Sequence, residues 1–86
     1  MSGKQEGSGI QETVLGYIRS LTPNMQIDSG HRLIADLGLE GDDTTALAIY
    51  LERHFRIRIP QSDWAEVWTV RDLIEVIERH LAYSGR

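Results

Sequence analysis

With 86 residues, of which 41% are hydrophobic, the chain is long enough for one small domain and too short for two. It has no cysteine, which excludes disulfides, thiolate nucleophiles and cysteine-based zinc sites. Thirteen Asp and Glu against nine Lys and Arg give a net charge of −4, which disfavours nucleic acid and anionic membranes and favours basic protein surfaces as partners.

No apolar run approaches the ~20 residues that a membrane helix needs. The first residues also lack the basic and apolar regions of a signal peptide. We therefore expect a soluble, cytoplasmic monomer that does not insert into a membrane.

The first predicted helix follows a flexible tail. Residues 1–9 contain three glycines and two serines and have no apolar side chain after Met1, so they bury too little to become ordered. From Ile10 onward, apolar residues recur every three or four positions, which predicts one helix over about 10–21. Pro23 stops it, because proline disfavours helical geometry in the residue before it. Its apolar face comprises Ile10, Val14, Leu15, Ile18 and Leu21.

A long connection, from about Thr22 to Gly41, joins this helix to the next. Connections of this length are uncommon in compact domains unless they are pinned to the core or are functional. Six apolar residues are predicted to pin it: Met25, Ile27, Leu33, Ile34, Leu37 and Leu39.

The second predicted helix covers about 42–55. Leu47, Leu51 and Phe55 share one side of it, with Tyr50 and His54 flanking them. Acids gather where it begins, at the positive end of the helix dipole. Gly41 and Asp42 are the two candidates for its N-cap.

Two further helices are predicted in the last third of the chain. Pro60 precedes a short helix over 61–67. Thr69 and Asp72 fit a capping box, which begins the last helix. Residues 56–59 alternate Arg and Ile, so a very short strand is an alternative there, although no partner strand is visible. The last helix carries Val70, Leu73, Ile74, Ile77 and Leu81 on one face.

These segments resemble an acyl or peptidyl carrier protein in their order and spacing. The likeness rests on the stretch Leu33-Ile34-Ala35-Asp36-Leu37-Gly38, the helix from Asp43 to Phe55, Ile59-Pro60 and Thr69-Val70. It implies an all-α, four-helix bundle with a long first loop and a short third helix. The carrier-like domain would span residues 10–82, with a frayed C-terminus at 83–86.

The chain departs from that family at the position that carries its prosthetic group. Carrier proteins have an Asp-Ser-Leu motif where the second helix begins, and the serine oxygen bears 4′-phosphopantetheine. The aligned residues here are Glu40, Gly41 and Asp42. Glycine has no side-chain oxygen, so we predict no phosphopantetheine at Gly41 and no cofactor. Thr44 and Thr45 are the nearest hydroxyls, but they lie off the aligned position.

Asp42 also replaces the apolar residue of the family motif, and one substitution does not account for two differences. Natural divergence is therefore favoured over a single replacement of the attachment serine.

The resemblance also implies a docking face on the second helix. Five acids and no base lie between Asp36 and Glu52, and in the family this acidic helix docks onto Lys and Arg patches of biosynthetic enzymes. The alternative is a charged face that is merely solvated. The predicted partner-binding residues are Glu40, Asp42, Asp43, Ala46, Ile49, Glu52 and Arg53.

Three large aromatic residues give further hypotheses. Tyr50 and Trp64 stand where the resemblance implies smaller residues. The favoured interpretation is that both are ordinary core or boundary residues; the alternative is that they fill the space that carriers open for an acyl chain. Trp64 and Trp68 are four apart and are predicted to share one helical face. If either is exposed, it is a candidate anchor for a partner.

No catalytic, metal-binding or DNA-binding pattern emerges. The three histidines are dispersed, and no nucleophile motif accompanies them. The segment 36–47 places Gly41 at the sixth position of a calcium loop, but Gly38 and Leu47 stand where ligands are needed. No helix has a basic face for DNA. A small hydrolase or ligand-binding bundle therefore has no positive support, and no catalytic or metal residues are assigned.

The leading hypothesis is a carrier-protein-like interaction module without the prosthetic group. The alternative is an acyl or peptidyl carrier of fatty-acid, polyketide or nonribosomal peptide biosynthesis whose attachment serine has been replaced. In both cases the protein is not an enzyme.

Overall fold

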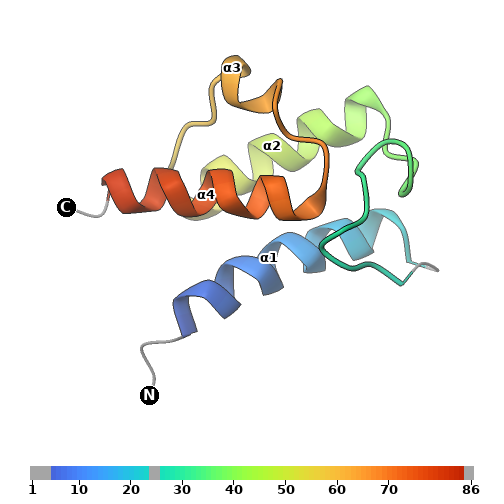
Figure 1. Cartoon of the computed structure of the whole chain (residues 1–86), viewed down its shortest axis with the longest axis horizontal. Coiled ribbons are helices and arrows are strands. Elements are labelled where there is room, and N and C mark those ends of the chain that lie inside the picture. The colour runs from blue at the N-terminus through green and yellow to red at the C-terminus, as the bar shows by residue number, and fades with distance from the viewer. Residues whose placement is uncertain (1–4, 24–25, 85–86) are drawn as a thin grey trace.

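The chain forms four helices in the order α1 (Gln5–Leu21), α2 (Gly41–Phe55), α3 (Gln61–Trp64) and α4 (Val70–Ser84), as Figure 1 shows. The structure is a computed structural model that describes residues 5–23 and 26–84. It confirms the all-α bundle with a long first loop and a short third helix. None of the described helices is both long enough and apolar enough to cross a bilayer.

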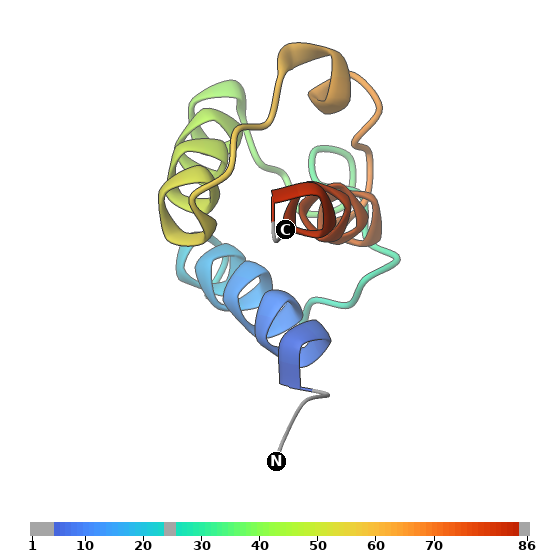
Figure 2. The same ribbon diagram turned by 90° about the vertical axis from the view of Figure 1, so that its left-hand side faces the viewer.

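The helices enclose one core. In Figure 2, α2 and α4 lie beside each other over α1, and α3 bridges them on the side away from α1. α1 packs against both α2 and α4. Each predicted apolar face points into this core. The residues with no exposed surface are Val14, Ile18, Leu47, Leu51, Val70, Leu73 and Ile77.

The first loop is fixed largely by the side chains predicted to pin it. Leu33, Leu37 and Leu39 are buried, and Ile27 packs against the core. Ile34 does not: it is 66% exposed. Residues 33–37 form a helix-like turn, so Leu33 and Leu37, four apart, share the inner face and Ile34 is rotated away from it. Met25 lies outside the described residues.

Three helix bounds differ from the prediction. α1 begins at Gln5, inside the segment assigned to a flexible tail, because extending an existing helix costs far less than nucleating one and no proline blocks it. Residues 1–4 lie outside the described part. α4 continues through residue 84, and 85–86 are not described. α3 ends at Trp64 and not at residue 67.

The helix starts show how local side chains set the bounds. The N-cap of α2 is Glu40, not Gly41 or Asp42, and its N–H donates to Oδ2 of Asp43 at 3.1 Å. The capping box at α4 is confirmed. There the N–H of Thr69 donates to Asp72 Oδ2 and the N–H of Asp72 donates to Thr69 Oγ1, both at 3.1 Å.

The possible strand at 56–59 does not form. Arg56 adopts a left-handed conformation (φ 57°) and its N–H bonds the carbonyl of Glu52, which ends α2. The N–H of Ile57 bonds the same carbonyl at 3.0 Å. These residues therefore close a helix and do not pair as a strand.

Candidate functional site

A cavity of about 610 Å³ lies between α2, α3 and the first loop. Most of its walls are apolar or aromatic, with a few polar groups among them. Such a concave, mainly apolar surface is the usual form of a binding site. It is lined by Arg32, Leu33, Ile34, Ala35, Thr44, Thr45, Ala48, Ile49, Glu52, Ile59, Gln61, Trp64, Ala65, Val67 and Trp68.

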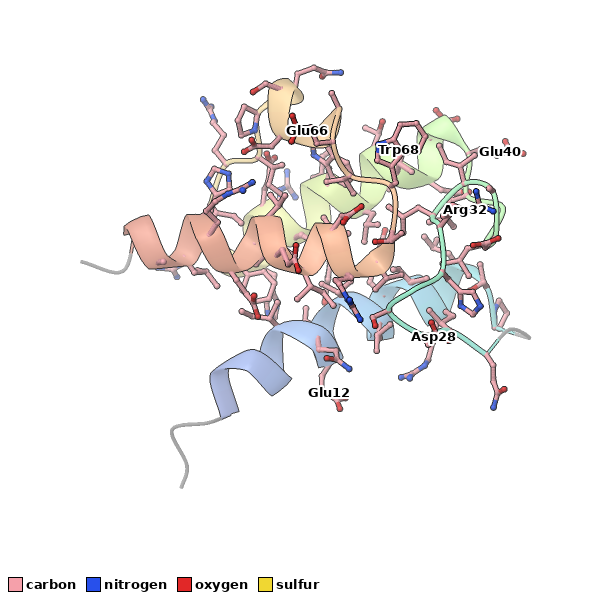
Figure 3. The ribbon with its side chains drawn as sticks, viewed as in Figure 1. Glu12, Asp28, Arg32, Glu40, Glu66 and Trp68 are labelled. Carbon is pink, nitrogen blue, oxygen red and sulfur yellow. The ribbon has the colours of Figure 1, made fainter. Side chains whose placement is uncertain are left out.

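Two exposed side chains from different segments border this cavity. Trp68 is 68% exposed and Ile34 is 66% exposed. Figure 3 shows Trp68, Arg32 and Glu40 at the end of the molecule where the first loop meets α2, and Glu66 beside α3. The predicted condition for an anchor, an exposed tryptophan, is therefore met by Trp68 and not by the half-buried Trp64.

The backbone around Trp68 is held on both sides. Its carbonyl accepts the N–H of Leu33 at 2.9 Å, and its own N–H donates to Asp72 Oδ2 at 3.1 Å. Arg32 and Thr69 form an isolated antiparallel bridge next to these bonds. The indole is thus presented from a segment that is tied to both the first loop and α4.

Two carboxylates in this region are perturbed by hydrogen bonds. The backbone N–H of Arg32 donates to Asp36 Oδ2 at 2.8 Å, and this bond, helped by the guanidinium of Arg32, lowers the pKa of Asp36. Partial burial raises the pKa of Asp72, but the N–H groups of Trp68 and Thr69 outweigh it and leave this pKa below its ordinary value. Both carboxylates thus accept hydrogen bonds mainly from backbone N–H groups of residues three or four positions earlier in the chain.

The seven predicted partner-binding residues lie on α2 and at its N-cap, but they are not equally available. Asp43 bonds the N–H of Glu40, and Glu52 Oε2 accepts the N–H of Ile59 at 2.7 Å. These two half-buried acids therefore help to hold the fold. Ala46 is half-buried as well, whereas the exposed members are Glu40, Asp42, Ile49 and Arg53.

Gly41 is the first residue of α2 and is exposed. A Cβ atom built on it meets nothing within 4 Å. Its carbonyl accepts the hydroxyl of Thr44 at 3.0 Å. Thr44 and Thr45 both line the cavity, so Gly41 stands about one turn before the cavity wall.

Tyr50 and Trp64 are ordinary boundary residues, in agreement with the favoured interpretation. Tyr50 is 37% exposed and stacks on Tyr17 of α1, with ring centroids 4.4 Å apart, so it lies outside the cavity. Trp64 packs against the core and forms part of the cavity wall. Because α3 ends at Trp64, it shares no helical face with Trp68, yet both border the same cavity.

The sequence prediction missed Ile34 as a surface residue and overlooked Val67 as a lining residue of the cavity. A signal for Ile34 was present, because Leu33 and Leu37 are four apart and a helical turn that buries both must turn Ile34 outward. Nothing in the sequence pattern marks Val67, because its position depends on how the segment after α3 returns to the core.

The histidines remain apart from one another. His80 Nε2 lies 2.7 Å from Asp63 Oδ2 and links α4 to α3, and His54 stacks near Tyr50 with centroids 5.8 Å apart. His31 Nδ1 accepts the N–H of Asp28 at 3.0 Å. Among the described residues, no three metal-ligating side chains gather.

The chain is similar to an acyl carrier protein of Campylobacter hominis. The two are 29% identical over 69 residues, which cover 80% of this chain and 85% of that protein. No protein-family model matches the chain. Together with the all-helical fold, this similarity supports a relationship to the acyl carrier protein family.

Proposed function

We propose that this chain is an acyl-carrier-protein-like module that acts by binding other proteins and carries no phosphopantetheine at residue 41. The observation that carries the proposal is Gly41 itself, at the first position of α2 where carriers have their attachment serine. A phosphodiester needs a side-chain oxygen, and glycine has none. Residue 41 therefore offers no atom to which 4′-phosphopantetheine could be attached.

The neighbouring hydroxyls do not replace the missing serine. The hydroxyl of Thr44 donates a hydrogen bond to the carbonyl of Gly41, and Thr45 lies five positions after the N-cap, more than one turn into the helix. Binding through the surface of α2 is then the function that this scaffold retains. Exposed acids at Glu40 and Asp42 suit partners with basic docking patches, such as biosynthetic enzymes.

Incubation with coenzyme A and a broad-specificity phosphopantetheinyl transferase, followed by intact mass measurement, tests the proposal. We expect no change in the mass of the natural chain. A gain in mass by Gly41→Ser under the same conditions would indicate that the scaffold is still recognised as a carrier. No gain by either chain would indicate surfaces adapted to other partners. A gain by the natural chain would refute the proposal.

One observation favours the second candidate, a carrier whose serine has been replaced. Residue 41 has open space around its Cα, so a serine fits there without displacing any neighbour. Under this alternative Gly41→Ser would be modified and would then accept acyl groups from a carrier-dependent synthase. A modified Gly41→Ser that accepts no acyl group would favour the interaction module.

A further inference from the structure

The described part of the chain exposes few large hydrophobic side chains, and most of them meet at one place. Ile34, Ile49, Tyr50 and Trp68 are the exposed members. All except Tyr50 line the cavity, although they come from the first loop, α2 and the segment before α4. Exposed apolar groups that gather around a hollow mark an interaction site, whereas scattered ones need no explanation.

This groove, bordered by Ile34, Ile49 and Trp68, is already organised for binding. The backbone of Trp68 is fixed by two hydrogen bonds: its carbonyl accepts the N–H of Leu33, and its N–H donates to the side chain of Asp72. Ile34 sits on a turn closed by the bond from Gly38 N–H to its carbonyl at 3.0 Å. Ile49 is on a helix. Little backbone freedom is lost when such groups are covered, so their burial contributes efficiently to affinity.

The charges beside Trp68 and Ile34 are mainly negative. Arg32 is the one cation among the lining residues, and its Nε lies 3.4 Å from Asp36 Oδ2. Glu66 is exposed between Ala65 and Val67, two lining residues that follow α3. Glu40 and Asp42 are exposed at the start of α2, four and two positions before its first lining residue, Thr44. Glu66 and Glu40 thus stand on either side of Trp68, and each favours a cationic group beside it.

We propose that the groove is the docking site for a protein segment with a large apolar side chain next to Lys or Arg. The apolar side chain packs between Trp68 and Ile34, and neighbouring Lys or Arg side chains lie near Glu66 on one side of Trp68 and near Glu40 on the other. This proposal rests on the proposed function and makes it specific. A second copy of the chain is disfavoured as the occupant, because two copies with a net charge of −4 repel each other.

Selection from a phage-displayed library of random peptides on the full chain tests this inference. We expect the enriched peptides to combine an aromatic or large aliphatic residue with neighbouring Lys or Arg. One enriched peptide is then synthesised and its dissociation constant measured by calorimetry. Failure to enrich any peptide, or enrichment of peptides without basic residues, would overturn the proposal.

Matched variants locate the peptide. Trp68→Ala is expected to weaken binding about tenfold or more, as for an anchor residue, whereas Tyr50→Ala, an exposed aromatic outside the groove, leaves it unchanged. Ile34→Ser, in the first loop, is expected to weaken peptide binding as well, because Ile34 also borders the groove. Glu66→Lys is expected to weaken binding about threefold at low salt, and Glu75→Lys on α4 serves as its charge control. Circular dichroism verifies that each variant is folded.

Other results point to other occupants and would overturn the inference. If dodecanoate displaces the peptide and Glu66→Lys has no effect on peptide binding, the occupant is an acyl chain. If the chain self-associates and Trp68→Ala abolishes that association, the occupant is a second copy. Binding that Asp42→Lys weakens but Trp68→Ala and Ile34→Ser do not would refute the groove and leave the α2 docking surface standing. The proposed function fails separately, if the natural chain gains a phosphopantetheinyl group.

Discussion

Glu52 and Ile59 are joined by a short hydrogen bond, from the backbone N–H of Ile59 to Oε2 of Glu52 at 2.7 Å. This bond ties α2 to the segment that leads into α3. Both residues line the cavity, and Ile59 is only 5% exposed. A carboxylate that was predicted to meet a partner thus holds one wall of the groove in place.

Replacing Glu52 with alanine should lower the free energy of unfolding by about 1–3 kcal/mol, because a buried N–H group loses its acceptor. Glu52→Gln keeps an acceptor oxygen and should lose less. Arg53→Ala, at the exposed neighbouring position, should stay within about 0.5 kcal/mol of the natural protein. Urea denaturation followed by circular dichroism measures all three. Equal losses for Glu52→Ala and Arg53→Ala would contradict a structural role for Glu52.

The two neighbouring acids at the start of α2 should respond differently to charge reversal. Asp43→Lys removes the acceptor of the Glu40 N–H, so it should lower the free energy of unfolding by about 0.5–2 kcal/mol. Asp42→Lys changes the interaction with the helix dipole from favourable to unfavourable, which costs a few tenths to about 1 kcal/mol for each of the two charges. Thermal denaturation distinguishes them. Asp42 is therefore the residue to reverse in docking experiments, since an effect of Asp43→Lys mixes folding with binding.

Gly41→Ser should fold as well as the natural chain. A Cβ atom at this position meets no neighbour, and a side chain restricts the unfolded chain more than glycine does. The free energy of unfolding should therefore be unchanged or higher by up to about 1 kcal/mol, as measured by urea denaturation. A loss of more than about 1 kcal/mol would show that the start of α2 tolerates only glycine, and would weaken the use of this variant in the transferase assay.

The capping box of α4 should make the fold sensitive to acid. The pKa of Asp72 is lower in the folded state than its ordinary value, so its contribution is complete above the unfolded pKa of about 3.9 and is lost as the pH falls through the folded value. Asp72→Asn should lower the free energy of unfolding by about 1 kcal/mol at neutral pH and reduce its further loss on acidification.

Denaturant titrations at several pH values, with Glu75→Gln as an exposed control on the same helix, test this. The free energy of unfolding of Asp72→Asn should still fall as the pH is lowered. Part of this remaining dependence is expected to come from Asp36, whose pKa is lowered as well. An unchanged acid response in Asp72→Asn would contradict the assignment.

Most of the fold was predictable because helical spacing identifies the buried faces. Val14 with Ile18 on α1, and Leu47 with Leu51 on α2, are each four apart and fully buried. The Thr69–Asp72 capping box was predictable for a different reason: its two partners are only three residues apart in the sequence. The ends of the helices were harder to predict. Residues 5–9 contain no apolar side chain that would indicate a helix, yet α1 includes them.

The groove was not predictable, because its walls come from segments that are distant in sequence. Trp68 is placed by a hydrogen bond with Leu33, and Glu52 is engaged by Ile59. Neither pairing leaves a periodic pattern. A bulky residue such as Trp64 is equally compatible with filling a cavity and with forming its wall, and the path of the chain after α3 decides between them.

The most direct test is the intact mass of this protein purified from the cells that naturally produce it. If the chain works through its surfaces alone, the measured mass equals the mass of the polypeptide, with no phosphopantetheinyl group attached. A natural population whose mass is higher by one phosphopantetheinyl group, located by fragmentation on α2, would contradict this and would make the protein a loaded carrier.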